Sequence, residues 1–185
     1  NLRVIEDAAH AFGTKYKDNL IGSIGDIVCF SFDGIKNITS GEGGCVVTSD
    51  SKIAENIKNA RLLGVEKDSD NRYKNLRSWN FDVSNQGWRY HMSNIMAAIG
   101  IQQLKKFNKF ATLRKQIAIK YDELLSSNQN IKFLNRDYKN VVPHIYVIRI
   151  KGLNDRDGLR IAMNNKGIEL GVHYTPNHFL SFFKS

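Results

Sequence analysis

Two side chains in this sequence, Lys36 and Asp7, have the types and surroundings needed to act on one cofactor. Lys36 follows an apolar, strand-like run, I-V-C-F-S-F, and precedes the small residues of G-E-G-G. Asp7 ends a similar run, R-V-I-E-D, earlier in the chain. A lysine amine can form a Schiff base with the aldehyde of pyridoxal phosphate, and a carboxylate can pair with its pyridine nitrogen so that the ring accepts electrons. The two runs therefore indicate pyridoxal-phosphate chemistry.

Each of these residues also has an ordinary structural interpretation. A lysine in a loop is normally a solvated surface charge, and Asp7 in D-A-A-H could be a helix N-cap. The glycines after Lys36 permit tight turns, in which a sequestered amine is a better nucleophile. Asp7 and His10 could share one face of a helical turn, but two ligands without a third are weak evidence for a metal, and we expect none.

Ser31 lies five residues before Lys36 and could offer its hydroxyl to a cofactor phosphate. The following G-E-G-G is not a phosphate-binding loop of the nucleoside-triphosphatase type, because G-x-x-x-x-G-K-[ST] is absent. Chemistry on nucleoside triphosphates is therefore not indicated.

The composition, with 42% hydrophobic and 24% charged residues, is that of a soluble globular protein. No window resembles a membrane span or a secretory leader, so we expect a cytoplasmic protein. Cys29 and Cys45 lie in apolar runs and are expected to be reduced. The sequence starts within a strand-like run and stops on an apolar cluster, and we interpret both ends as cuts through a larger protein.

The formal net charge of +9 is concentrated in the middle of the chain, where residues 61–120 carry 12 basic and 4 acidic side chains. Such a region could attract phosphorylated ligands or nucleic acid. The alternative is that much of it is a solvated helix face, K-K-F-N-K-F-A-T-L-R-K. No RNA-binding or helix-turn-helix motif supports nucleic acid as a partner.

The elements that must position these residues alternate between strands and helices. The patterns predict a hairpin over 14–22 with its turn at Asp18-Asn19, and a long loop over 65–90. The strands are expected over 2–5, 27–32, 44–48, 141–150 and 168–172. The helices are expected over 52–63 with an N-cap among residues 49–51, from a cap at Ser93 or Asn94 to 107, over 112–125, and from Asn154 or Asp155 to 166, with Gly167 ending the last one. This order indicates an α/β fold with a boundary near residues 107–115.

Three blocks of sequence carry a resemblance to a known family. They are V-I-E-D-A-A-H-A-F-G, then F-S-F-x-x-x-K-N-I-T-S-G-E-G-G-C-V-V-T, then G-W-R-Y-H-M-S-N-I-M-A-A-I-G-I-Q-Q-L. The chain resembles the nucleotide-sugar aminotransferases of the DegT/StrS type, pyridoxal-phosphate enzymes of the aspartate-aminotransferase fold (fold type I). The resemblance continues through V-P-H-I-Y-V-I-R-I to V-H-Y-T-P-N-H and covers nearly the whole chain.

The resemblance implies a role for each matching residue around the cofactor. Lys36 would be the lysine that binds pyridoxal 5′-phosphate, and Asp7 the partner of the pyridine nitrogen. His10, often glutamine in relatives, would contact the ring oxygen, and Ser31 the phosphate. Arg89 stands where relatives carry an asparagine that reaches the neighbouring subunit's phosphate, and arginine can also bind phosphate.

For the substrate, the resemblance implies that His173 and Tyr174 lie near the nucleotide-sugar site. The amino donor would be an amino acid, glutamate in the first instance. The chain would comprise part of the large cofactor-binding domain, with a mixed, mostly parallel sheet, over 1–110, and a small α/β domain over 111–185. A homodimer with shared active sites is expected, in polysaccharide or antibiotic biosynthesis, with neither nucleic acid nor membrane as a partner.

The resemblance also implies that this sequence holds only part of the residues that bind the cofactor. Relatives carry a phosphate-binding loop and a ring-stacking aromatic residue upstream of the position that matches Asn1. We therefore expect this chain alone to bind pyridoxal phosphate poorly and to be inactive. Two alternatives remain open: a related sugar dehydratase or regulatory protein, and a basic, non-catalytic anion-binding module. Lys36 argues against the dehydratases, some of which carry histidine at that position.

Overall fold

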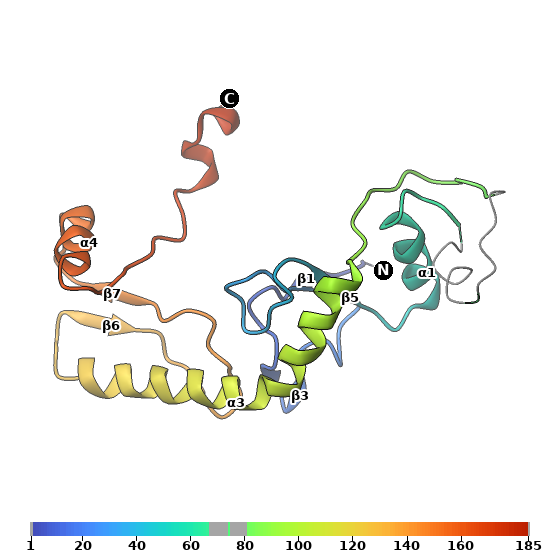
Figure 1. Cartoon of the computed structure of the whole chain (residues 1–185). Coiled ribbons are helices and arrows are strands. Elements are labelled where there is room, and N and C mark those ends of the chain that lie inside the picture. The colour runs from blue at the N-terminus through green and yellow to red at the C-terminus, as the bar shows by residue number, and fades with distance from the viewer. Residues whose placement is uncertain (1, 67–73, 75–80, 185) are drawn as a thin grey trace. The chain divides into compact units, whose positions relative to one another are not determined.

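The fold was obtained as a computed structural model that describes residues 2–66, 74 and 81–184 (Figure 1). The chain forms two compact units. Unit 1 contains residues 1–127 and 133–147, and unit 2 contains residues 128–132 and 148–185. The domain boundary predicted between residues 110 and 111 stays a prediction for the complete protein.

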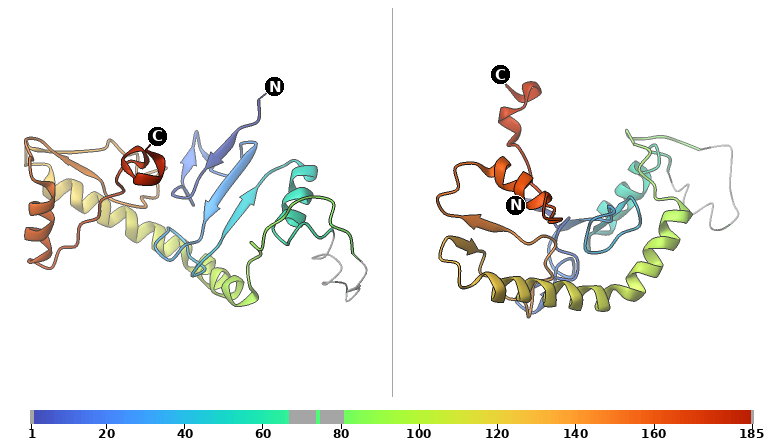
Figure 2. Two further views of the ribbon diagram at one scale, coloured as in Figure 1. Left: turned by 90° about the horizontal axis from the view of Figure 1, so that it is seen from above. Right: turned by 60° about the vertical axis from the view of Figure 1, so that its left-hand side comes forward.

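Unit 1 is organised around a three-stranded mixed sheet in the order β1-β4-β5 (Figure 2). Strand β1 (Ile5–Asp7) runs parallel to β4 (Ile27–Ser31), with Asp7 opposite Cys29. Strand β5 (Gly44–Val47) is antiparallel to β4. The predicted strands over 27–32 and 44–48 are confirmed within a residue. The strand predicted over 2–5 lies further along the chain, because β1 begins at Ile5 and ends at Asp7.

The sheet register separates the two cysteines. Cys29 pairs with Val46, whereas Cys45 pairs with Phe30. Paired residues of an antiparallel ladder share a face and successive residues alternate, so the two thiols lie on opposite faces. Both are free, and burial raises the pKa of the Cys45 thiol. This geometry agrees with reduced cysteines.

The core of unit 1 lies against the sheet, around the buried side chains of Ala8, Val28 and Phe30. Phe12 packs edge-on against three other rings, those of Phe30, Phe32 and Phe107, with centroids 5.0–6.0 Å away. This edge-to-face arrangement suits the charge distribution of aromatic rings. The aromatic cluster fixes the segment after β1 against the long helix that carries Phe107.

A short hairpin follows this segment and consists of β2 (Lys15–Tyr16) and β3 (Asn19–Leu20). The hairpin was predicted correctly, but its turn is Lys17-Asp18 and not Asp18-Asn19. Both turn residues have positive φ, 48° and 65°. Two central residues with positive φ match the twist of a two-residue hairpin.

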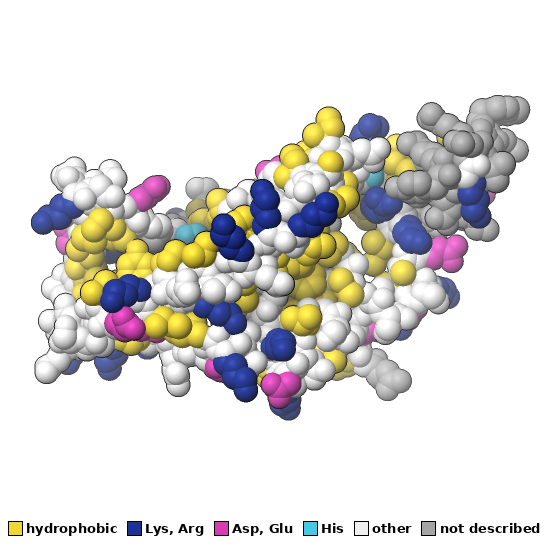
Figure 3. Space-filling model, turned by 60° about the horizontal axis from the view of Figure 1, so that its bottom comes forward, with side chains coloured by type: hydrophobic (Ala, Val, Ile, Leu, Met, Phe, Trp, Pro, Cys, Tyr) yellow, Lys and Arg dark blue, Asp and Glu magenta, His cyan; other side chains and the backbone are white. Residues whose placement is uncertain are grey.

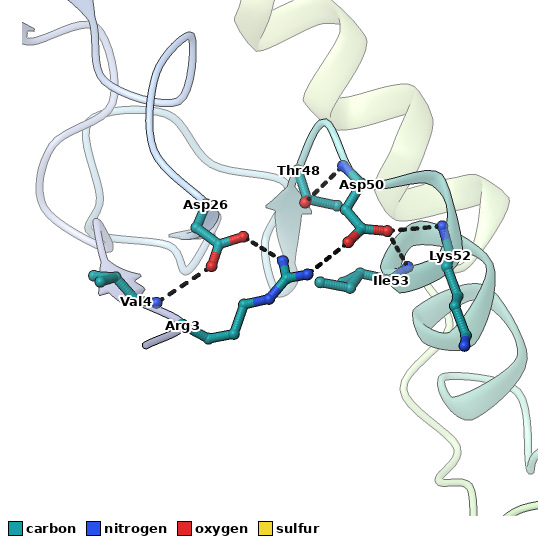
Figure 4. A network of polar contacts seen from close by, with 7 residues as sticks. All are labelled: Arg3, Val4, Asp26, Thr48, Asp50, Lys52 and Ile53. Atoms are coloured by element: carbon teal, nitrogen blue, oxygen red, sulfur yellow. Dashed lines mark hydrogen bonds and ion pairs between the residues drawn. The ribbon is translucent and has the colours of Figure 1, made fainter. Parts of the chain in front are cut away.

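Helix α1 (Ser51–Ala60) is capped by Asp50, whose Oδ1 accepts hydrogen bonds from the backbone N–H of Lys52 and Ile53 (Figure 4). The other oxygen of Asp50 accepts from Arg3, which also donates to Asp26 at 2.6 Å. One arginine thus ties the start of the chain to the residue before β4 and to the cap of α1. The cap prediction is confirmed, although the helix ends at Ala60 rather than at residue 63.

Helix α3 (Asn94–Leu125) is a single helix of 32 residues that starts at the predicted cap, Ser93. The prediction of two helices, broken between 107 and 112, was wrong. That stretch contains neither glycine nor proline, and the Thr112 hydroxyl donates to the Asn108 carbonyl one turn earlier, at 3.0 Å. In the described part of the chain, no helix combines the length and the hydropathy that crossing a membrane requires.

The segment after α3 returns to unit 1 without forming the long strand predicted over 141–150. Val142 is buried; its N–H donates to the Thr14 hydroxyl and its carbonyl accepts from Asn37. Side chains therefore satisfy the backbone groups that a strand would have used. Regular pairing is confined to β7 (Ile148–Ile150).

Unit 2 contains a two-stranded sheet of β6 (Ile131–Phe133) and β7, followed by helix α4 (Arg156–Asn164). The predicted cap Asp155 and the terminator Gly167, with φ of 76°, are confirmed. The strand predicted over 168–172 is absent from the described residues, because the Ile168 N–H caps α4 through the Met163 carbonyl. Two short 3-10 helices follow, η1 (Asn177–Phe179) and η2 (Ser181–Phe183).

Candidate functional site

The sheet of unit 1 brings the expected carboxylate and hydroxyl to the same edge. Asp7 is the last residue of β1 and Ser31 is the last residue of β4, and the two strands are parallel neighbours. In parallel strands the carboxyl ends lie at one edge, where ligands of open α/β sheets bind. Sheet topology thus gives Asp7 and Ser31 a common location that the sequence alone could not establish.

The Asp7 carboxylate remains open to a ligand. Its Oδ1 accepts a hydrogen bond from the Ala9 N–H at 3.0 Å, which fixes its orientation. Among the residues that the structure describes, none donates to Oδ2, and the residue is exposed. The Ser31 hydroxyl accepts from the Asp33 N–H at 3.3 Å, so its proton can be donated elsewhere.

His10 and Lys36 meet at this edge of the sheet. His10 lies in the turn after β1, and Lys36 lies in the loop after β4. Lys36 Nζ lies 3.0 Å from His10 Nε2. Because a lysine ammonium has donors and no acceptor, Nε2 accepts, and we assign the proton of the neutral imidazole to Nδ1. Two residues that are 26 positions apart in sequence thus form a direct side-chain pair.

The loop that carries Lys36 is held by polar groups in its own turn. The Lys36 N–H donates to the Asp33 carbonyl at 3.1 Å. Ser40 is completely buried; its N–H donates to the Phe32 carbonyl and its hydroxyl donates to the Glu42 carbonyl. These bonds close the loop between β4 and β5, so Lys36 projects from a fixed backbone.

The glycines of G-E-G-G contribute through their backbone conformation and lack of a side chain. Gly43 has φ of 136°, and a Cβ there would lie 2.7 Å from Met92 Cε. Glycine is the residue that allows both this conformation and this close approach. The positive φ of Gly41 and Gly43 and the bend at residues 41–42 agree with the backbone freedom that these glycines permit.

Three residues that sequence reasoning missed surround the Lys36–His10 pair, namely Asn37, Arg114 and His144. Asn37 is 3% exposed and its side chain donates to the carbonyls of Phe12 and Val142. The His144 ring packs against the His10 ring with centroids 4.0 Å apart and the planes tilted by 39°. Their positions depend on long-range packing, and no local pattern marks them.

Arg114 belongs to the basic stretch that we interpreted largely as a solvated helix face, and for this residue that interpretation was wrong. Its guanidinium donates to the Lys36 carbonyl at 3.3 Å and to the His144 carbonyl at 3.2 Å. Arg114 is partly buried, unlike the exposed Lys105, Lys106 and Lys109 of the same helix. One signal was available, because Arg114 interrupts a series of lysines.

Arg89 lies apart from this group in the described residues. It is exposed, forms an isolated bridge with Leu62, and lies between Trp88 and Tyr90, whose rings stack 6.2 Å apart. Within residues 2–66, 74 and 81–184, no hydrogen bond or ion pair joins it to Lys36. Most of the predicted 65–90 loop lies outside the described residues.

His173 and Tyr174 belong to unit 2, and both are exposed. Their ring centroids are 5.0 Å apart, which makes them one local aromatic pair. Their expected part in substrate binding stays a prediction.

Comparison with known proteins shows what this chain is similar to. The model of the DegT/DnrJ/EryC1/StrS aminotransferase family matches residues 1–185, the whole chain. A relative from Campylobacter jejuni, UDP-4-amino-4,6-dideoxy-N-acetyl-beta-L-altrosamine transaminase, is 33% identical over 100% of this chain and 48% of its own length. The chain spans about half the length of the curated relatives it matches.

Solved structures of aminotransferases also match this chain over nearly its whole length. PseC of Helicobacter pylori, an aminotransferase involved in the biosynthesis of pseudoaminic acid, matches with a TM-score of 0.87 and 28% identity, over 98% of this chain and 48% of that one. Spr1654 of Streptococcus pneumoniae, solved in a PLP-form, matches with a TM-score of 0.85 and 28% identity, over 98% and 46%. The α/β arrangement with small mixed sheets therefore corresponds to about half of such a structure.

Proposed function

The chain belongs to the DegT/DnrJ/EryC1/StrS aminotransferase family, and from this premise we propose that the complete protein is a pyridoxal-phosphate-dependent aminotransferase. It transfers an amino group from an amino acid, in the first instance glutamate, to a nucleotide-linked keto sugar. The contact that carries the proposal is the 3.0 Å approach of Lys36 Nζ to His10 Nε2. It lies in the loops after the parallel strands that end in Asp7 and Ser31.

The donor set fits pyridoxal 5′-phosphate in its chemistry. Asp7 offers an exposed carboxylate with one oxygen open, which suits a protonated ring nitrogen. Ser31 has a hydroxyl proton to donate to a phosphate oxygen. Lys36 supplies the amine, and the neighbouring His10 supplies a ring nitrogen for a hydrogen bond to the ring oxygen.

When bound, the cofactor supplies an aldehyde that takes up amines and a ring that accepts electrons. The residues of this chain bind it and move protons. Lys36 would hold the group through its amine and, once the amino donor has displaced that amine, would act as acid and base toward the substrate carbon. Asp7 would keep the proton on the ring nitrogen.

The second substrate is proposed from unit 2 and from the relatives. His173 and Tyr174 form an exposed pair of hydrogen-bonding rings that suits a nucleotide sugar. The Campylobacter jejuni relative is named for a UDP-linked amino sugar, which supports this substrate class. We also propose a homodimer in which Arg89 reaches the partner's phosphate in place of the asparagine of relatives.

The test is an assay of the complete protein with glutamate and nucleotide-linked keto sugars, following the 2-oxoglutarate formed. Because a general base contributes about 10²–10⁴-fold, Lys36→Ala is expected to abolish turnover while sugar binding is retained. Lys52→Ala, which alters an exposed lysine of α1, serves as the control and keeps full activity. Turnover by Lys36→Ala at the rate of the unchanged protein would contradict the proposal.

The same assay, together with substitution of Asp7 and Lys36, separates the aminotransferase from the two alternative functions. A sugar dehydratase would consume the keto sugar precursor without forming 2-oxoglutarate. A basic anion-binding module would bind polyanions in a salt-sensitive manner and would be unaffected by substitution of Asp7 and Lys36. The pairing of Lys36 with His10 favours the aminotransferase, because this chemistry requires a reactive amine at that position.

A further inference from the structure

Arg114 closes a ring of contacts around Lys36. At one end, Lys36 Nζ contacts the His10 imidazole at 3.0 Å. The His10 ring packs against the His144 ring with centroids 4.0 Å apart. The His144 carbonyl accepts from Arg114 Nη1 at 3.2 Å, and Arg114 Nη2 donates to the Lys36 carbonyl at 3.3 Å. The series of contacts that starts at the Lys36 amine therefore ends at the Lys36 backbone carbonyl.

The bridging depends on the shape of the guanidinium. Arginine presents separate N–H groups in a rigid planar fork, so two of them can reach two carbonyls at once. A lysine ammonium is one nitrogen on a flexible stem and cannot reproduce this geometry. Both carbonyls accept a charge-assisted hydrogen bond, which is stronger than a neutral one.

The ring joins three parts of unit 1 that are distant in sequence. Arg114 comes from the middle of α3, Lys36 from the loop after β4, and His144 from the segment before β7. Asn37 supports the same junction, because its amide donates to the Val142 carbonyl at 3.1 Å. The backbone of the Lys36 loop is thus attached to the segment that carries the His144 ring.

We propose that Arg114 is a positioning residue for Lys36. It holds the Lys36 backbone and the His144 backbone together, so that the two packed imidazoles keep the lysine amine at one place on the sheet edge. The inference deepens the proposed function and rests on it for its catalytic consequence. The positioning itself concerns only contacts within this chain.

A matched control is adjacent in the same helix. Lys115 Nζ donates to the Lys139 carbonyl at 3.1 Å, so this residue also bonds a returning backbone carbonyl with a positive side chain. Arg114→Met and Lys115→Met each remove one positive charge together with a side chain that donates to a backbone carbonyl. Both substitutions keep a good helix former. The two variants differ in whether the lost bonds lead to Lys36.

The experiment measures how fast Lys36 reacts with an amine-acylating reagent in the complete protein without added cofactor, by mass spectrometry of its peptide. Lys36 is a half-buried residue and its amine contacts an imidazole, so this contact leaves a reagent fewer directions of approach. We expect Arg114→Met to raise the rate at Lys36 by at least about threefold to tenfold, because both hydrogen bonds of the bridge are lost and each is worth no less than an ordinary one. Lys115→Met leaves that rate unchanged.

A double variant shows whether Arg114 acts through His10. His10→Ala removes the contact with Nζ and is expected to raise the Lys36 rate by the same factor. Because both substitutions open one ring, Arg114→Met adds nothing further in the His10→Ala background. An unchanged rate in Arg114→Met, or a full second increase in the double variant, would overturn the inference.

Arg114→Lys keeps the charge and helix propensity, and it serves if Arg114→Met does not fold. We expect it to resemble Arg114→Met at Lys36, whereas a lysine that restores the unchanged rate would refute the bridging role. In the transaminase assay, Arg114→Lys is expected to lower kcat by about 10–100-fold, as misplacement of a reacting group does, with little change in KM. If the unchanged protein shows no transaminase activity, the proposed function fails, while the labelling result still decides the positioning.

Discussion

At the scale of single residues, the site combines groups with exposed reactive atoms and buried groups that hold the backbone. Asp7 is exposed, whereas the neighbouring Asn37 and Ser40 are buried and bond backbone carbonyls. The Asn37 amide nitrogen and the Ser40 hydroxyl are thus satisfied by backbone carbonyls, as most buried polar groups are, and these bonds restrict both side chains. The candidate reactive residues could be selected from sequence because their types suit a known chemistry, and their roles stay predictions.

The charge of Asp7 can be tested separately from its hydrogen bond. Asp7→Asn keeps an oxygen that can accept from the Ala9 N–H but removes the negative charge that we propose faces the ring nitrogen. We expect turnover of the complete protein to fall on the order of 100-fold, as when an electrostatic partner of the reacting group is removed. Asp18→Asn, in the hairpin turn at φ of 65°, is the control because asparagine accepts this conformation. Equal turnover in both variants would exclude the proposed role of Asp7.

At the scale of elements, the site depends on how turns and caps attach the strands to the helices. The hydrogen bonds of Arg3 join the segment before β1 and the residue before β4 with the cap of α1. Arg3 and Asp26 precede the parallel strands, so this network lies at the opposite end of these strands from Asp7. The aromatic cluster around Phe12 joins the segment after β1 to α3. Each attachment can be weakened without altering a residue of the site.

The Asp50 cap makes the stability of this region depend on pH. The hydrogen bond from Arg3, followed by that from the Ile53 N–H, lowers the pKa of Asp50 below its ordinary value. A lowered pKa means that the stabilisation is present above the unfolded pKa of about 3.9 and is lost as the pH falls through the folded pKa. Asp50→Asn keeps a capping oxygen but loses the charge, so its Tm should be lower than that of the unchanged chain above about pH 4.

Thermal unfolding of both proteins between about pH 2.5 and 6 checks this expectation across the titration of aspartate. The difference in Tm is expected to shrink toward the acid end and also to shrink in high salt, because the Arg3 ion pair is exposed. A difference in Tm that is constant over the whole range would show that the carboxylate charge of Asp50 contributes nothing.

The contact between Gly13 and α3 provides a second test at this scale. Gly13 has φ of 80°, and a Cβ added there would overlap the ring of Phe107. Gly13→Ala is therefore expected to destabilise unit 1 by more than about 1 kcal/mol, since both the backbone and the packing oppose it. Urea unfolding measures the loss. Gly152→Ala, at φ of 74° but with open space around its Cβ position, separates the backbone effect from the packing effect.

At the scale of the whole molecule, the chain exposes many large apolar side chains. Five apolar residues of α3 are more than half exposed: Ile95, Ile101, Leu104, Ile117 and Leu124. Figure 3 shows hydrophobic side chains between the lysines and arginines on the face where α3 lies. Large exposed apolar patches mark surfaces that contact other protein. This agrees with a chain that spans about half the length of its curated relatives.

We therefore predict that the 185-residue chain takes up pyridoxal phosphate poorly on its own and self-associates. The measurements are the absorbance spectrum after addition of the cofactor and the size distribution by sedimentation, with the complete protein as the control. A stable yellow complex of this chain alone would show that the groups around Asp7 and Lys36 suffice to hold the cofactor.

The sequence by itself determined the local features: the caps Asp50, Ser93 and Asp155, the apolar strands β4 and β5, and the reactive types at Asp7, His10, Ser31 and Lys36. These follow from propensities and chemistry that act over a few residues. Tertiary structure alone decided that residues 141–147 are irregular, whereas the break wrongly predicted within α3 had no glycine or proline to support it. Tertiary structure also decided that Arg114, His144 and Asn37 converge on Lys36. The physical reason is that their partners lie up to 105 positions away for Asn37, and bonds over such separations form only once the sheet, the helix and the returning segment have packed.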